Sequence, residues 1–327
     1  MDLIYVCKLK QIKNFLTTLK DCGKTHQPLL DNRNCINNNG MIHLHIAIYF
    51  ESQNEYNLMK KHYLKAIELG NRYAMYNLGS WYKEHHDYKM MEEYYLMAIE
   101  LGDPDAMANL GIWYEEQGDY KMMEEYLIMA INLGNHNAMT NLGLWYHHQL
   151  NYEPMKKYYL MAIELGNRDA MYNLGIWYRD QQDYEMMIKY YLMAIELGNR
   201  NAVYNLGLWY EEQQDYEMMK KYYLMAIELG DVNAMFNLGL WYKKKQRDYE
   251  SMVKYHSMAA DLGDMDAMCS LGCWYERRGV YESMVKYYLM AIKLGNANAM
   301  YNLQIYCEKH KDYELNEILL KIIENEM

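Results

Sequence analysis

Every Trp of the chain falls in one register, which advances by 32 residues along most of the sequence. The seven positions are Trp81, Trp113, Trp145, Trp177, Trp209, Trp241 and Trp274. Glycines keep the same step at Gly70, Gly102, Gly134, Gly166, Gly198, Gly230, Gly263 and Gly295, with one extra residue before Gly263. A fixed period of this size, within about 20 to 50 residues, indicates stacked copies of one small structural unit. We therefore expect the core to lie within and between neighbouring repeats, so that 327 residues need no single large core.

Each period contains two helical patterns. In the repeat at 169–200, Ala170, Leu174 and Trp177 are spaced i, i+4, i+7 and form one apolar stripe. The second pattern carries two stripes, one of Tyr184, Met187, Tyr191 and Ala194 and one of Met186, Tyr190, Met193 and Leu197. A helix that is apolar on two sides must pack both on its own partner and on the next repeat. Asp183 is placed to cap the start of this helix, and Gly198 to end it with a positive φ.

Composition and charge exclude several classes of protein. The net charge is −11, whereas a protein that binds phosphate backbones needs a basic stripe, so nucleic-acid binding is disfavoured. No run of eighteen apolar residues is present, and the N-terminal residues lack a signal-peptide pattern. The six Cys form no CxxC pair, which is typical of a reducing compartment. We expect a cytoplasmic protein with no membrane partner.

No residue pattern indicates catalysis. The sequence has no Gly-rich phosphate loop after a strand and no nucleophile–base set, and its Asp and Glu recur in every repeat. His85 with His86 and His147 with His148 fall two repeats apart, too far for one metal ion. Cys269 and Cys273, with Cys307 and His310 in the next repeat, weakly suggest zinc, but Cys commonly replaces a small apolar residue. We expect no enzyme activity, no cofactor and no metal.

The repeat resembles the Sel1-like repeat, a branch of the tetratricopeptide superfamily. The matching positions are Asp183, Met187, Tyr191, Ala194, Gly198, Ala202, Leu206, Gly207 and Tyr210, and the resemblance covers about 40–324. Two features depart from the family. The turn between the helices is short, and Met stands where the family has the small Ala that brings paired helices close (Met91, Met123, Met187 and Met219). Met at this position is expected to widen the spacing between the two paired helices or to change the direction in which they pack. The resemblance implies a scaffold or adaptor without catalytic residues.

Pattern and resemblance together predict an all-α solenoid, a right-handed superhelix of about nine antiparallel helix pairs with a 32-residue period. We expect residues 1–39 to form a capping helix and an Asn-rich loop, residues 40–324 to form the solenoid, and residues 325–327 to be a tail. The repeats start near 40, 72, 104, 136, 168, 200, 232, 265 and 297. The pattern in 8–21 is also typical of a membrane-surface helix, but the first repeat needs its apolar edge covered.

The first helix of each repeat has a face directed away from the second, which lines the concave side of a tetratricopeptide stack. It carries aromatic residues, aliphatic residues four positions later, and a ladder of Asn. The predicted partner groove consists of Tyr76, Asn109, Ile112, Asn141, Leu144, Tyr172, Asn173, Ile176, Tyr204, Asn205, Leu208, Phe236, Asn237 and Leu240. Asn offers a donor and an acceptor to a peptide backbone. The alternative is that these residues only pack between adjacent first helices, and the sequence leaves both interpretations open.

The groove differs from one that clamps a C-terminal carboxylate, because that clamp needs Lys or Arg beside the Asn. Here those places hold Asp105, Asn137, Asp169, Asn201 and Tyr73. A basic cluster lies elsewhere, in the turn with the inserted residue and the same turn one repeat on. Its members are Lys243, Lys244, Lys245, Arg247, Arg277 and Arg278. They could receive an acidic or phosphorylated motif, or simply be solvated turn residues.

These observations predict a non-catalytic scaffold or adaptor that binds protein or peptide segments on its concave face. A structural component that assembles with itself is the first alternative, and a nucleic-acid-binding helical array is the second. The sequence leaves the oligomeric state open.

Overall fold

The computed structural model describes residues 38–317 and residue 319, and within them every regular element is a helix and none is a strand. The helices in chain order are α2 (Asn38–Ser52), α3 (Tyr56–Glu68), α4 (Arg72–Glu84), α5 (Tyr88–Glu100), α6 (Pro104–Glu116), α7 (Tyr120–Asn132), α8 (His136–His148), α9 (Tyr152–Glu164), α10 (Arg168–Asp180), α11 (Tyr184–Glu196), α12 (Arg200–Glu212), α13 (Tyr216–Glu228), α14 (Val232–Trp241), η1 (Tyr242–Gln246), α15 (Tyr249–Asp261), α16 (Met265–Arg278), α17 (Tyr281–Lys293) and α18 (Ala297–His310). The predicted capping helix at 8–21 and the tail lie outside these residues.

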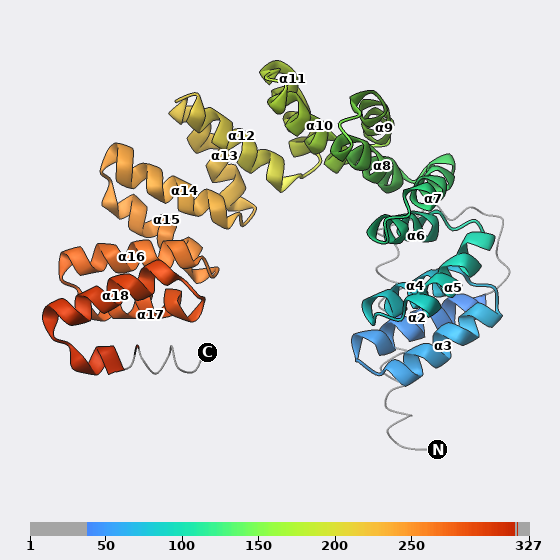
Figure 1. Ribbon diagram of the computed structural model, residues 1–327, viewed down its shortest axis with the longest axis horizontal. Coiled ribbons are helices and arrows are strands. Elements are labelled where there is room, and N and C mark those ends of the chain that lie inside the picture. Colours follow the sequence, from blue (N-terminus) through green and yellow to red (C-terminus); the bar gives the residue numbers. More distant parts are fainter. Residues whose placement is uncertain (1–37, 318, 320–327) are drawn as a thin grey trace. The chain divides into compact units, whose positions relative to one another are not determined.

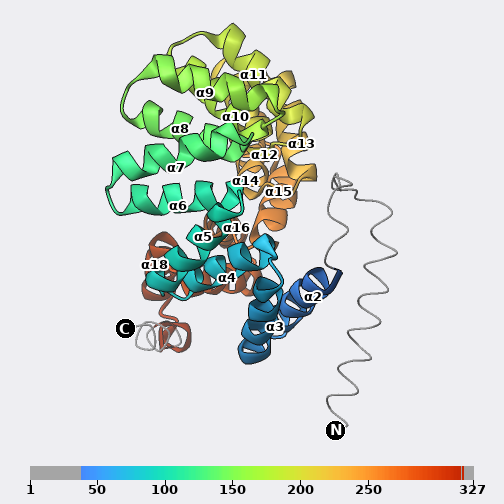
Figure 2. The ribbon, with the colours of Figure 1, turned by 90° about the vertical axis from the view of Figure 1, so that its right-hand side faces the viewer.

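The chain divides into two compact parts, Met1–Asn167 and Arg168–Met327. Within each part, consecutive helices form antiparallel pairs, and each second helix also packs on the first helix of the next pair. In the C-terminal part, α14/α15 follow α12/α13, and α16/α17 follow in turn (Figure 1). Figure 2 shows α12 to α16 in the view turned by 90°. The prediction of an all-α solenoid of helix pairs is confirmed.

The helix ends follow from local sequence. The Asp183 side chain accepts a hydrogen bond from the Met186 amide at 3.1 Å, which satisfies one of the free N–H groups at the start of α11. Gly198, with φ +77°, turns the chain out of the same helix. The cap of α12 does more than close its own helix: Asn199 accepts from the Ala202 amide and donates through Nδ2 to Asp169 Oδ1 at 3.0 Å. The cap of one repeat thereby holds the repeat before it.

The two helices of a pair approach most closely at a glycine of the first helix. A Cβ added to Gly175 would lie 2.6 Å from the ring of Tyr191, and one added to Gly207 would lie 2.7 Å from the ring of Tyr223. Both Tyr side chains are fully buried. The glycine therefore leaves room for a large ring between the paired helices. The buried Met residues, such as Met187, fill the same interface without exposure.

The Trp register is explained by contacts between repeats. Tyr184 at the start of α11 lies 5.9 Å from the ring of Trp209 in the next repeat, and Tyr216 lies 5.6 Å from Trp241. Aromatic pairs at this separation stabilise beyond the area that they bury. Trp241 is only 4% exposed. The Trp side chains thus join neighbouring repeats as well as filling their own.

The inserted residue is absorbed where the first helix of its repeat ends. There α14 passes into the π-helical segment η1, and Arg247 follows with φ 54° before α15 starts. A π-helical turn accommodates one extra residue without shifting the next helix. The expectation that Leu197 packs in a buried stripe is wrong, because its side chain is 46% exposed at the end of α11.

Candidate partner-binding surface

The predicted groove residues of the C-terminal part lie on three successive first helices. Tyr172 on α10, Tyr204 on α12 and Phe236 on α14 are half-buried. One helical turn later come three aliphatic side chains that are also half-buried: Ile176, Leu208 and Leu240. We call these six residues, together with Asn205 and Asn237, the ladder surface.

Each ring of the ladder surface rests on a buried ring of its own repeat. The centroid of Tyr172 is 5.8 Å from that of Tyr191, and the centroid of Tyr204 is 6.1 Å from that of Tyr223. The interplanar angles are 26° and 28°, so the rings are stacked. Stacking fixes the orientation of the outer rings, and one face of each is covered.

The Asn ladder is used between repeats. Asn205 Nδ2 donates to Tyr172 Oη at 2.9 Å, and Asn237 Nδ2 donates to Tyr204 Oη, also at 2.9 Å. Burial raises the pKa of Tyr204, and the hydrogen bond from Asn237 offsets this in part. Each such bond contributes about 0.5–1.5 kcal/mol net. The Asn amide groups therefore hold adjacent repeats in register.

The N-terminal part repeats the arrangement once. Asn109 Nδ2 donates to Tyr76 Oη at 3.0 Å, and Tyr76 stacks on the buried Tyr95. The remaining groove positions here are Ile112, which is half-buried, Leu144, which is 37% exposed, and the half-buried Asn141. Ala108 takes the aromatic position of α6, so the bond is not repeated on the next helix. Asn173 is half-buried on α10.

The sequence left open whether the groove residues bind a partner or pack between repeats. In the structure, some of these residues pack between repeats and others remain partly exposed. Each Asn donates one N–H to a Tyr hydroxyl of the repeat before it, which is the packing role. The aliphatic side chains and ring edges remain partly exposed. The ladder surface offers a strip of ordered apolar groups. A partner's apolar side chain that packs there gains about 25 cal/mol of binding free energy for each Å² of its surface that is buried.

The basic residues lie in two turns, one that follows α14 and one that follows α16. Lys244, Lys245 and Arg247 are exposed at η1 and just after it, and Arg277 is exposed at the end of α16. Arg278 lies over the ring of Trp274 at 4.6 Å. The side chain of Lys243 points away from the turn, and its Nζ donates to Ser270 Oγ of the next repeat at 3.4 Å.

A second apolar stripe, which sequence reasoning missed, runs along the second helices. Its members in the C-terminal part are Leu192, Leu197, Leu224, Leu229, Leu262 and Leu294, which are 39–57% exposed. The signal in the sequence that could have revealed part of this stripe is the Leu that directly precedes each turn Gly. Of these residues, Leu197 was predicted to be buried because it continues an apolar helical stripe.

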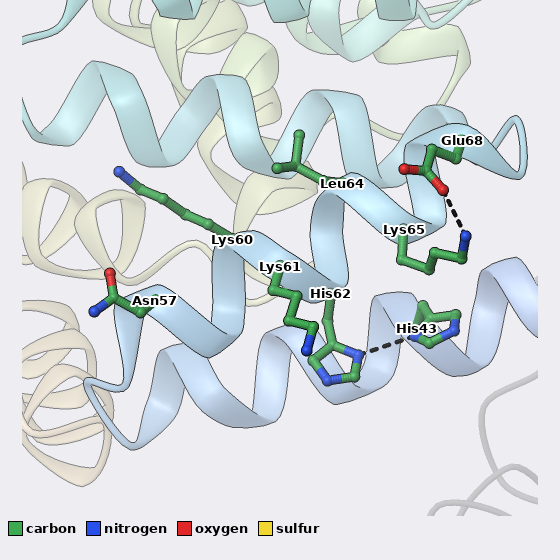
Figure 3. Close-up of a pocket in the computed structure, with 8 residues that line it drawn as sticks. All are labelled: His43, Asn57, Lys60, Lys61, His62, Leu64, Lys65 and Glu68. Carbon is green, nitrogen blue, oxygen red and sulfur yellow. Dashed lines mark hydrogen bonds and ion pairs between the residues drawn. The ribbon is translucent and has the colours of Figure 1, made fainter.

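A hollow of about 620 Å³ lies between α2 and α3 (Figure 3). His43 Nδ1 and His62 Nδ1 are 2.9 Å apart, and burial lowers the pKa of His62, with smaller contributions from His43 and Lys61. Lys65 pairs with Glu68 at 2.6 Å. Lys60 extends away and lies over the ring of Trp81.

The described residues contain no group of three or more His, Cys, Asp and Glu side chains that could hold a metal ion. None of the helices in the described ranges has the length and apolar character needed to cross a bilayer.

Comparison with known proteins agrees with this architecture. One tetratricopeptide repeat model matches residues 106–136 and 170–201, and a second matches residues 201–229. No curated protein matches the chain. A Sel1 repeat protein from Oxalobacter formigenes is 24% identical, with a TM-score of 0.52, over 67% of this chain and 99% of its own. Yeast Tom70 is 14% identical, with a TM-score of 0.54, over 99% of this chain and 78% of its own.

A protective antigen of uropathogenic Escherichia coli that displays an SLR fold is 20% identical, with a TM-score of 0.49, over 94% of this chain and 78% of its own. Paired helices, repeated caps and polar links between repeats define the class of α-helical repeat proteins. Within that class, three segments of the chain match tetratricopeptide repeat models, and the fold is similar to that of a Sel1 repeat protein.

Proposed function

We propose that this protein is a non-catalytic scaffold or adaptor, and that the ladder surface binds an apolar face of a partner's extended or helical segment. The observation that carries the proposal is the partial exposure of Leu208, Leu240 and their neighbouring rings on successive first helices. Ordered apolar side chains that remain accessible bind a partner at a low entropic cost.

The paired polar groups support the same occupant. Asn205 and Asn237 each commit one N–H to a Tyr hydroxyl, so fewer amide donors are left for a bound segment. The partner must therefore contribute apolar side chains, which a helix presents at i, i+3 and i+4 spacing.

The test compares two matched double variants. Leu208→Ser with Leu240→Ser alters the ladder surface, while Leu192→Ser with Leu224→Ser alters the second-helix stripe, where the side chains are 39% and 41% exposed. Each tagged chain is purified from its native cells, and co-purifying proteins are quantified by mass spectrometry. Proteins lost only from the ladder variant are then titrated against the purified chains by calorimetry.

We expect the ladder variant to weaken binding by about 2 kcal/mol or more, roughly 30-fold in Kd, as interface anchors do. The stripe variant should bind like the unaltered chain, and both should keep the helical circular dichroism spectrum. Loss of the partner from the stripe variant alone would move the site to the second helices. Retention by both variants would contradict the ladder surface as the binding site.

A further inference from the structure

The ladder positions change character on α16. The place of Tyr204 and Phe236 is taken by Cys269, and the place of Leu208 and Leu240 by Cys273. The two cysteines are four residues apart on one helix, so both lie on the same face. This is the only repeat, among those described, in which both positions hold thiols.

The two sulfur atoms share polar neighbours from the next helices. Asn302 Nδ2 on α18 is 3.3 Å from Cys273 Sγ and 3.9 Å from Cys269 Sγ. The Tyr288 hydroxyl on α17 is 3.3 Å from Cys273 Sγ and 2.7 Å from a Glu276 carboxylate oxygen. An amide N–H is a stronger donor to a thiolate than to a thiol, so Asn302 favours the ionised form.

The hydrogen bonds and charges around the two thiols favour the ionised form of one of them. Cys269 donates to Cys273, which lowers the pKa of Cys273 and raises the pKa of Cys269. Tyr288 and Lys243 also lower the pKa of Cys273, against burial and the Glu276 carboxylate, which raise it. Asp266 adds to the rise at Cys269.

Access distinguishes the two thiols. Cys273 is half-buried, while Cys269 is 8% exposed. Cys307 is 3% exposed, and burial raises its pKa. A small reagent can therefore reach Cys273 first, and Cys269 lies beside it.

We propose that Cys269 and Cys273 are a redox-active dithiol, in which Cys273 attacks a small soluble disulfide and Cys269 resolves the product. The Cys273 thiolate forms a bond to one sulfur of the disulfide, and the other sulfur leaves as a thiolate. Cys269, losing its proton to water, then attacks Cys273 Sγ and expels the second thiolate. The net reaction oxidises two protein thiols to one disulfide and reduces one disulfide to two thiols.

The helix limits the stability of the product. Residues i and i+4 of an α-helix have Cα atoms about 6.2 Å apart, within the range of disulfides, but their Cβ atoms are about 5–6 Å apart. A disulfide needs Cβ atoms about 3.5–4.5 Å apart, so closure must distort α16 locally. A bond formed under such strain is easily reduced, which makes the oxidation reversible.

The experiment uses the intact chain and measures each cysteine by peptide mass spectrometry. Both thiols fall in one tryptic peptide, residues 255–277, and Cys307 in another serves as the internal control. Oxidised glutathione at neutral pH should remove two hydrogens from the 255–277 peptide, and dithiothreitol should restore them. The iodoacetamide rate at Cys273, followed from pH 5 to 9, should level off at a lower pH than that of an ordinary thiol, which titrates near about 8.5. The rate is followed over pH because a rate at one pH is not diagnostic. A thiol with a low pKa has a larger thiolate fraction, but its thiolate is less nucleophilic, and the two effects nearly cancel.

The chain itself supplies substitutions that this register tolerates. Ala108 occupies the Cys269 position, and Ser80, whose hydroxyl lies 3.1 Å from Tyr95 Oη, occupies the Cys273 position. Cys269→Ala should move the Cys273 profile to higher pH and leave a persistent glutathione adduct on Cys273. Cys273→Ser should leave Cys269 unmodified at neutral pH.

Three results would overturn the dithiol: an ordinary thiol profile at Cys273, no loss of two hydrogens with oxidised glutathione, or a lasting glutathione adduct on the unaltered chain. Any of them would mean that the cysteines are only small apolar residues of the ladder.

Discussion

The closest contact between paired helices is a sensitive point for substitution. In Gly207→Ala, the new methyl group would lie 2.7 Å from Tyr223 Cδ1 and 2.9 Å from Cε1. To reach ordinary contact near 3.4 Å, the ring must move by about 0.7 Å. Tyr223 is fully buried and its hydroxyl donates to Glu211 at 2.6 Å, so the ring cannot move freely. Overpacking of this kind costs about 2–3 kcal/mol, and the better helix propensity of Ala returns about 1 kcal/mol.

We therefore expect Gly207→Ala to destabilise the protein by about 1–2 kcal/mol. Urea denaturation followed by far-ultraviolet circular dichroism measures the change, and hydrogen exchange of α12 and α13 locates it, because repeat proteins can unfold in parts. The control is Gly207→Ala combined with Tyr223→Leu. It copies the repeat in which Gly111 faces Leu127, where an added Cβ would lie 3.0 Å from the Leu side chain.

The double variant should recover at least about 1 kcal/mol relative to the sum of the two single changes, since the ring that clashes is gone. A Gly207→Ala protein that is more stable than the unaltered chain would refute the reasoning. It would mean that the glycine serves no packing purpose and that only helix propensity acts at this position.

Three further predictions concern the turn residues, a buried Trp and a buried His. Gln182 has φ 60°, so Gln182→Gly should raise thermal stability by about 0.5–1 kcal/mol in calorimetry, whereas Gly118→Ala, which meets no atom within 4 Å, should lower it by a similar amount. Trp241→Ala should cost about 3–5 kcal/mol in urea denaturation, because the ring is 4% exposed; a cost below about 0.5 kcal/mol would place it at the surface. Burial, with Lys243 adding to it, lowers the pKa of His256 to about 4, so the folded chain binds fewer protons than the unfolded one. The stability present above pH 6.5 should fall by about 1.4 kcal/mol per pH unit down to pH 4, and His256→Tyr should remove that dependence in pH-resolved denaturation.

The helix pairs and their caps were predictable because their causes are local. Asp183 and Gly198 act within a few residues of their own positions, and the Trp register states the period directly. Intrinsic preference and periodicity therefore agree with the fold in the repeats that keep these residues, whereas Val280, which precedes α17, gives no side-chain cap.

The roles of the surface residues were harder to predict because their partners lie a whole repeat away. Asn205 meets Tyr172 33 residues earlier, and no local pattern separates that bond from a free amide. Leu197 continues an apolar stripe, yet it lies where α11 ends and the neighbouring repeat no longer covers it. Lys243 belongs to the turn by sequence, but its long side chain reaches Ser270 in the following repeat.

The π-helical segment η1 shows where the chain can change length. One additional residue there is taken up between Tyr242 and Arg247, and the next helices keep their pairing and their caps. The solenoid thus has a site at which added residues leave the stack unchanged. For protein engineering, the peptide bond between Gln246 and Arg247 is the position of choice for an epitope or a short sensor module. Such a graft would be carried at the outer end of a rigid hairpin.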